Sequence, residues 1–228
     1  MTAAWMPMLD GRTLVFSEPV FEPAHLFGEI AHGLALTNRF SGQTMLPYSV
    51  AQHSLLAAEG ALKETGDTEL AALCLLHDGH EAPFGDWTRP AMDAVEEEIR
   101  RAAIENGATE IQAKSLAVRM RSSVERVKAR LDRAILTAAG LDPGGLVRRA
   151  AEVREYDMRA LFTEKRDLLS PQKRTWGAFS KGEPKPLPTR RGGLRSMHWS
   201  DAQHAWCTML ANLCPDAAQR AGWTPSTT

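Results

Sequence analysis

The stretch that most constrains the fold is residues 75–86, LLHDGHEAPFGD. It overlaps the end of a run of apolar residues whose spacing predicts a helix over 68–77. His77 lies on the apolar face of that helix, and the carboxylate of Asp78 comes directly after it. An unpaired buried charge costs on the order of several kcal/mol, so this pair needs a proton, an ionic partner or a metal.

Two other helical stretches carry polar side chains on faces that should be buried. A capping box predicts a helix over 50–65, and His53 lies on its apolar stripe. A helix over about 147–169 has Asp157 in the middle of its apolar stripe. One divalent metal could satisfy all these groups, and mixed nitrogen and oxygen ligands suit Mn, Co, Zn, Fe or Ni. Three separate, hydrogen-bonded polar groups are the alternative interpretation.

The residues after Asp78 add groups that could act beside such a metal. Glu81 lies one helical turn beyond His77, where it could serve as a general acid or base. Asp86 follows a proline and a glycine, and either caps the next element or binds a ligand hydroxyl. His80 points about 100° away from Glu81 on a helix, so we expect it to have a supporting role or to face solvent.

The N-terminal and central parts of the chain predict a mainly α-helical fold. Alternating β-branched and aromatic residues in 12–22 predict one short N-terminal β-hairpin. Helical spacing begins at Ala24 and gives way to a loop over 38–42. Residues 94–139 are rich in helix formers and predict two helices that break near Asn106.

The C-terminal part begins with a basic segment. Residues 171–196 contain four prolines, four glycines and seven Lys or Arg against one acid, which predicts a flexible basic loop. A last helix should carry Trp206, and the tail from Pro215 is expected to fray.

Composition limits the class of partner. The 228 residues include 27 Lys or Arg and 28 Asp or Glu, so the net charge of −1 provides no general positive field for duplex nucleic acid. No stretch approaches the ~18 apolar residues that span a bilayer, and the N-terminus lacks a signal-peptide pattern. We expect one cytoplasmic domain over 1–228 with no membrane partner. The three cysteines lack paired spacing and are expected to be reduced core residues.

Four segments occur in an order that resembles the HD superfamily of metal-dependent phosphohydrolases. The resemblance is strongest to its bacterial and phage HD-domain 5'-deoxynucleotidase branch, and covers most of residues 24–169. It implies an HD-domain helical bundle, in which a helical insertion over 98–128 is additional and could serve oligomerisation. The segments are NRF (38–40), SVAQHS (49–54), LLHDGHEAPFGD (75–86) and VREYDMRALFTEKRDLL (153–169).

The resemblance also implies roles for individual residues. Arg39 corresponds to the arginine that holds the substrate phosphate, Glu81 to the proton-transfer carboxylate, and Asp86 to the acid that approaches the sugar. Phe40 stands where the best-known deoxynucleotidases have Trp, which leaves the sugar preference open. The implied activity is removal of the 5'-phosphate of deoxynucleoside monophosphates by a metal-activated water. The implied metal ligands are His53, His77, Asp78 and Asp157.

Several alternatives remain open at this point. A dNTP triphosphohydrolase is suggested by the phrase APFG, although that branch carries His at the position of Glu81. A non-catalytic, nucleotide-sensing helical module is the alternative from another functional class. Arg39 could instead cap a helix C-terminus, and 171–196 could be either solvated or a lid over the site. The expected partners are a nucleotide substrate and further copies of the chain as a homo-oligomer.

Overall fold

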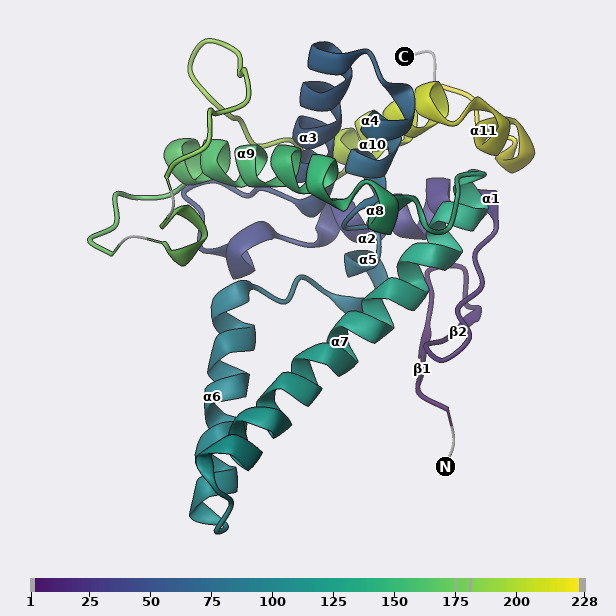
Figure 1. Cartoon of the computed structure of the whole chain (residues 1–228). Coiled ribbons are helices and arrows are strands. Elements are labelled where there is room, and N and C mark those ends of the chain that lie inside the picture. Colours follow the sequence, from purple (N-terminus) through teal and green to yellow (C-terminus); the bar gives the residue numbers. More distant parts are fainter. Residues whose placement is uncertain (1–2, 175, 181, 226–228) are drawn as a thin grey trace.

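The structure is a computed structural model that describes residues 3–174, 176–180 and 182–225. The described part is mainly α-helical, as predicted, and includes a two-stranded antiparallel sheet (Figure 1). Strand β1 (Trp5–Pro7) pairs with β2 (Thr13–Val15), so the hairpin begins before the predicted stretch 12–22. Gly11 closes the turn with a φ of 86°. Among the described residues, no helix is both long and apolar enough to cross a membrane.

The helical elements follow in chain order. They are α1 (Pro23–His25), the π-helical turn η1 (Leu26–Ile30), α2 (Ala31–Leu36), the 3₁₀ turn η2 (Arg39–Gly42), α3 (Val50–Thr65), α4 (Thr68–Leu76), α5 (Glu81–Phe84), α6 (Arg89–Glu105), α7 (Glu110–Ala139), α8 (Gly145–Arg148), α9 (Ala150–Leu168), the 3₁₀ turn η3 (Gly177–Phe179), α10 (Trp199–Leu213) and α11 (Pro215–Ala221).

Helices α3 and α4 have the boundaries that local sequence signals predict. Ser49 accepts a hydrogen bond from the Gln52 backbone, which begins α3, and Gly66 ends it with a left-handed φ of 69°. Asp67 accepts from the Leu70 backbone at 2.9 Å and begins α4. The two helices are therefore joined by a tight turn and pack side by side.

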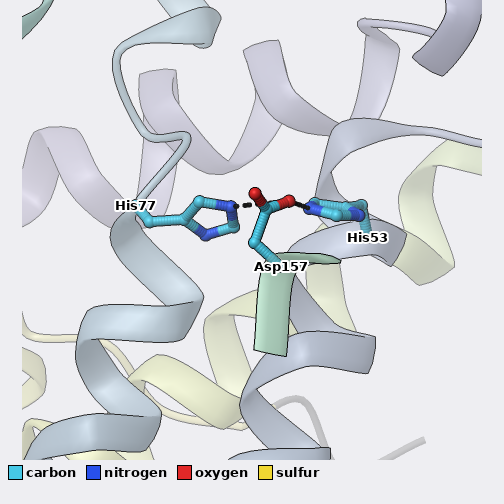
Figure 2. A group of neighbouring side chains, drawn as sticks. All are labelled: His53, His77 and Asp157. Atoms are coloured by element: carbon cyan, nitrogen blue, oxygen red, sulfur yellow. Dashed lines mark ion pairs between the residues drawn. The ribbon is translucent and has the colours of Figure 1, made fainter. Parts of the chain in front are cut away.

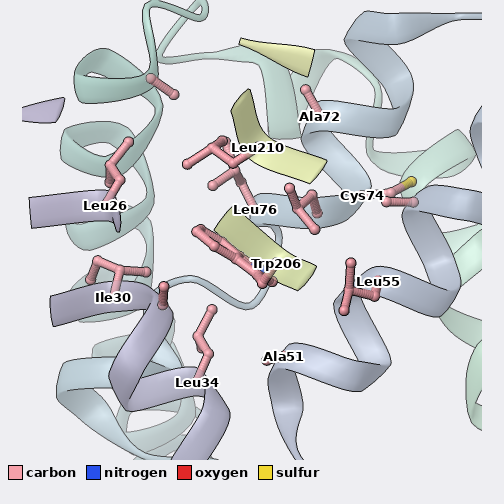
Figure 3. Packing of buried hydrophobic residues seen from close by; sticks show 14 of the residues in the cluster. Leu26, Ile30, Leu34, Ala51, Leu55, Ala72, Cys74, Leu76, Trp206 and Leu210 are labelled. Carbon is pink, nitrogen blue, oxygen red and sulfur yellow. The ribbon is translucent and has the colours of Figure 1, made fainter. Parts of the chain in front are cut away.

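Helix α10 completes the core against α2, α3 and α4. Its Trp206 is fully buried and lies between leucines of the neighbouring helices, including Leu34 and Leu55 (Figure 3). The three cysteines are buried and unpaired, as predicted. This packing holds α3, the helix that carries His53, against α4 and α9.

Helices α6 and α7 form a hairpin that projects away from the rest of the molecule (Figure 1). The predicted break near Asn106 is confirmed, but α6 begins at Arg89 rather than near 94, because Pro90 is well suited to the first helical turn. The predicted insertion 98–128 is the projecting part of this hairpin. We call residues 89–128 the arm.

Several C-terminal predictions are wrong in detail. The helix predicted over 147–169 is divided into α8 and α9 at Arg149, whose φ and ψ are −108° and 25°. The described part of the tail is helical where fraying was expected: Pro215 begins α11, whose Ala217 and Ala218 are buried against the core. Residues 226–228 lie outside the described residues. Tertiary packing thus stabilises a helix too short to be stable alone.

In their described parts, the two segments predicted to be loops each contain a 3₁₀ turn. The loop predicted over 38–42 contains the 3₁₀ turn η2. In the described part of 171–196, η3 is the one regular element, and Leu187 is buried against α3. A Cβ atom at Gly60 of α3 would lie 2.7 Å from Leu187 Cδ2, so glycine permits this close approach.

Candidate metal centre

Three helices bring the four predicted metal ligands together. His53 comes from α3, His77 and Asp78 follow the end of α4, and Asp157 comes from α9. Figure 2 shows both imidazoles directed at the carboxylate of Asp157, whose Oδ1 lies 3.3 Å from His53 Nε2 and 3.8 Å from His77 Nε2. Asp78 Oδ2 lies 3.6 Å and 3.3 Å from the same two nitrogens.

The second nitrogen of each imidazole has its own partner. His53 Nδ1 lies 2.7 Å from Glu164 Oε1, and His77 Nδ1 lies 2.8 Å from the Cys74 carbonyl oxygen. Both partners accept hydrogen bonds, so in each neutral imidazole Nδ1 carries the proton and Nε2 has the lone pair. Among the described residues neither buried Nε2 makes a hydrogen bond. Two uncommitted imidazole nitrogens therefore face two carboxylates.

The distances between these atoms fit one shared ion. Two ligand atoms each about 2.1 Å from an ion at a tetrahedral angle lie about 3.4 Å apart. The four nitrogen–oxygen distances are 3.3 to 3.8 Å. His53, His77 and Asp157 therefore form a group that could hold a metal ion, with Asp78 beside it, and the side chain of Asp157, 34% exposed, leaves it open to solvent.

The carboxylates and imidazoles shift one another's pKa values. Burial alone would raise the pKa of Asp78, but His77 and His53 hold it well below its usual range. Burial alone would lower the pKa of His77, but Asp78 and Asp157 raise it well above its usual value. Protons and a divalent cation therefore compete for the same atoms.

Glu81 is the first residue of α5 and lies next to this cluster. Ligating atoms of Asp78, His80 and Glu81 lie within 4.8 Å of one another. Glu81 is 5% exposed, and burial, followed by the charges of Asp78 and Asp86, raises its pKa well above the usual range. A carboxyl group with a raised pKa can exchange protons near neutral pH.

Asp86 follows the left-handed Gly85 and lies on the same side of the site. Burial raises its pKa, and the positive charge of Arg39 acts in the opposite direction. The residue before α6 is Thr88, which makes no side-chain cap, and Asp86 does not cap this helix. The capping alternative is therefore wrong, and its role as a ligand for a hydroxyl group remains a prediction.

Arg39 lies between two acids at the edge of the cluster. Its Nη1 is 3.5 Å from Asp78 Oδ2, and its Nη2 is 3.4 Å from Glu164 Oε2. Both distances exceed the roughly 2.8 Å of a tight charge-assisted hydrogen bond. Helix α2 ends at Leu36, and the residue that caps it is Thr37, whose backbone N–H donates to the Gly33 carbonyl, so the capping alternative for Arg39 is not what the structure shows. Its guanidinium retains donors for an anionic ligand.

Phe40 lies beside Arg39 in a strained backbone conformation. Phe40 and Ser41 have φ values of 55° and 51°, a left-handed region that bulky residues rarely adopt. The Phe40 ring lies 5.5 Å from Arg39 Cζ, and its centroid is 6.1 Å from that of Trp176. The segment 171–196 therefore reaches the edge of the candidate centre.

Glu164 was not expected from the sequence, and the position of His80 fits the supporting role rather than the solvent-facing one. Glu164 is fully buried and contacts both His53 and Arg39. It follows Asp157 by seven residues, so helical spacing places both on one face of α9, and this signal could have identified it. His80 does not face solvent: it is 6% exposed, with Nδ1 2.8 Å from Asp132 Oδ1.

Comparison with known proteins finds a similar protein, but its description assigns no function. No family model matches the chain. A curated relative, an uncharacterized protein of Rhodobacter capsulatus, is 41% identical over 99 residues. The matched stretch covers 42% of this chain and 50% of the relative, so the chain spans about half the length of the curated relative it matches. Functional inference therefore depends on the geometry of the site.

Proposed function

We propose that this protein is an HD-domain phosphohydrolase that removes the 5'-phosphate of deoxynucleoside monophosphates. The observation that carries the proposal is the convergence of two imidazole Nε2 atoms and two carboxylates from α3, α4 and α9. The proposed ligands of one divalent ion, Mn, Co, Zn, Fe or Ni, are His53, His77, Asp78 and Asp157. Arg39 beside them supplies a positive charge for a phosphate.

In the proposed mechanism, His53, His77, Asp78 and Asp157 would hold a divalent ion, which would lower the pKa of a water molecule and polarise a phosphate oxygen. Glu81 accepts a proton from the attacking water and returns it to the leaving 5'-oxygen. The new bond joins the water oxygen to phosphorus, and the bond between phosphorus and the 5'-oxygen breaks. Arg39 offsets negative charge on the phosphate as that charge is redistributed. Asp86 and Phe40 would contact the sugar.

A monophosphate suits the charges near the centre better than a triphosphate does. A triphosphate carries roughly four negative charges, which call for several cations or a second metal. Arg39 is the one arginine that pairs with a candidate ligand among the described residues. One observation favours dNTP triphosphohydrolase as a second candidate: the contact of Trp176 with Phe40 brings a basic segment to the site.

A panel of nucleotides with Mn, Co, Zn or Mg tests the proposed function. We expect orthophosphate to be released from deoxynucleoside monophosphates, with the products resolved by chromatography. Release of triphosphate from dNTPs would support the second candidate instead. Metal binding without turnover of any nucleotide would favour a non-catalytic nucleotide-sensing module.

Arg39→Ala sharpens the choice of substrate. We expect it to raise KM for a monophosphate about tenfold or more, because a charge-assisted contact to phosphate contributes roughly 1.5–3 kcal/mol. The matched control is the replacement of Lys173 and Arg174 by Ala, which removes positive charge from the basic segment instead of from the proposed phosphate site. These replacements should change KM little. If they abolish activity while the wild type releases triphosphate, the monophosphate proposal is wrong.

A further inference from the structure

Glu164 connects the two halves of the candidate site. It lies on α9, is fully buried, and is the partner of a proposed metal ligand on one side and of the proposed phosphate-binding arginine on the other. Its Oε1 lies 2.7 Å from His53 Nδ1, and its Oε2 lies 3.4 Å from Arg39 Nη2. Each carboxylate oxygen therefore serves a different functional group.

We propose that Glu164 is a positioning residue that orients His53 toward the metal and holds Arg39 in place for the phosphate. This inference rests on the proposed metal centre, but not on the identity of the substrate. It assigns Glu164 no contact with the metal or with the reacting atoms.

The first part of the argument concerns the tautomer of His53. An ionised carboxylate only accepts hydrogen bonds, so at 2.7 Å it fixes the proton of His53 on Nδ1. The lone pair then lies on Nε2, which faces Asp78 and Asp157. A carboxylate behind a ligating imidazole also makes it a stronger donor to the metal, and loss of such a partner typically costs 10- to 100-fold in metal affinity.

The second part concerns Arg39, which has two acidic neighbours: Asp78, a proposed metal ligand, and Glu164, which is not one. Asp78, 3.5 Å from Nη1, would share its charge with a bound cation and hold the arginine less strongly. Glu164, 3.4 Å from Nη2, is directed away from the ion by its bond to His53 and keeps its charge for Arg39. Arg39 Nε is buried and has no hydrogen-bond partner among the described residues. Glu164 thus holds the guanidinium at Nη2, and Nε keeps a donor that no described residue uses.

Affinity for Mn²⁺ tests the first part without any substrate. Mn²⁺ titrated into metal-free Glu164→Gln should bind about 10- to 100-fold more weakly than to wild type. Thr163→Val is the matched control, because Thr163 is equally buried on α9 but bonds to Arg159 and Leu187. The control should lose stability while keeping its Mn²⁺ affinity. Affinity of Glu164→Gln within twofold of wild type overturns the inference, whereas a wild type that binds no Mn²⁺ overturns the proposed metal centre.

Nitrogen-15 spectra of the metal-free protein, recorded at a pH high enough for His53 to be neutral, read the tautomer directly. We expect His53 to carry its proton on Nδ1 in wild type and in Thr163→Val. In Glu164→Leu, which offers no acceptor, that preference should be lost. If the leucine variant does not fold, the wild-type spectrum alone decides, because a proton found on Nε2 contradicts the proposed orientation.

A double-variant cycle tests the second part through affinity for inorganic phosphate in the Mn²⁺-saturated protein. Glu164→Gln should weaken phosphate binding when Arg39 is present, and should have little further effect in an Arg39→Ala background. This non-additivity is expected because the arginine cannot be misplaced once it is absent. Additive effects of the two substitutions would show that Glu164 does not act through Arg39.

Discussion

The candidate metal centre and the arm both contain many charged residues, which are mostly buried in the centre and exposed on the arm. In the centre, His53 and Glu164 are fully buried and bonded to each other. In the arm, charged pairs such as Arg101 with Glu98 lie on exposed helical surfaces. Exposed pairs contribute about 0–1 kcal/mol, whereas buried ones cost desolvation that only close partners offset. A buried charged cluster with uncommitted atoms therefore calls for a ligand, and an exposed one does not.

Apolar residues show a similar contrast along α7, the helix that runs from the arm into the core. Its C-terminal half buries Leu131 and Ile135 completely in the core. Its N-terminal half leaves Ile111 83% exposed and Val118 55% exposed. Self-association through these exposed side chains, which would make the protein a homo-oligomer, stays a prediction that light scattering can test.

Of all the substitutions considered, replacement of a proposed metal ligand should have the largest effect on metal content and activity. Replacing any one of the four ligands by Ala should abolish bound metal and turnover, because each removes a ligand atom from the shared ion. Elemental analysis and the nucleotide assay measure the two effects separately. Full activity in any of the four variants would show that the replaced residue is not a metal ligand. The variants are His53→Ala, His77→Ala, Asp78→Ala and Asp157→Ala.

Glu81→Gln should separate proton transfer from metal binding. Glutamine preserves the shape of the side chain but cannot accept the proton, so kcat should fall by a factor on the order of 10² to 10⁴. Metal content and Tm should stay near those of wild type. Loss of the metal in this variant would instead show that Glu81 is a ligand.

Two truncations of apolar side chains compare the regions by stability. Leu73→Ala, at a fully buried position of α4, should lower the free energy of unfolding by about 2–5 kcal/mol. Ile111→Ala, in the arm, should change it by less than about 0.5 kcal/mol in the monomer. Denaturant unfolding of both variants gives the values. A large loss for Ile111→Ala would show that the arm is covered by another copy in solution.

Acid should weaken metal binding by a smaller, graded amount. Burial and Arg39 act to lower the pKa of His53, but Glu164 and Asp157 outweigh them and raise it above its ordinary value. In the metal-free protein a second proton, on Nε2, therefore remains at pH values where a free histidine would be neutral. Metal affinity should fall by about tenfold per pH unit for each proton displaced as the pH drops through this raised pKa. Calorimetric titrations in buffers of different ionisation enthalpy count the protons released.

Local signals predicted the elements whose ends are encoded locally. Ser49 and Gly66 mark the two ends of α3, so its boundaries could be read from the sequence. Helix α11 was missed because Pro215 can end one helix or begin another, and the choice depends on the distant core that buries Ala217. Helix boundaries that depend on tertiary packing leave little trace in the local sequence.

The candidate site was partly predictable for a similar reason. His53 and Asp157 stood out as polar residues on apolar stripes, and the structure brings them within 3.3 Å of each other. Glu164 shares the face of Asp157, yet its partners His53 and Arg39 lie more than a hundred positions earlier in the chain. The contact of Trp176 with Phe40 depends on the path of a long irregular segment, which no helical period describes.

The central claim is that this chain holds one divalent ion between α3, α4 and α9. Elemental analysis of the purified protein, compared with His53→Ala and with the arm variant Ile111→Ala, tests it most directly. We predict about one divalent transition-metal ion per chain in wild type and in Ile111→Ala, and none in His53→Ala. The claim is contradicted if wild type contains no such metal and neither binds Mn, Co, Zn, Fe or Ni nor gains turnover from any of them.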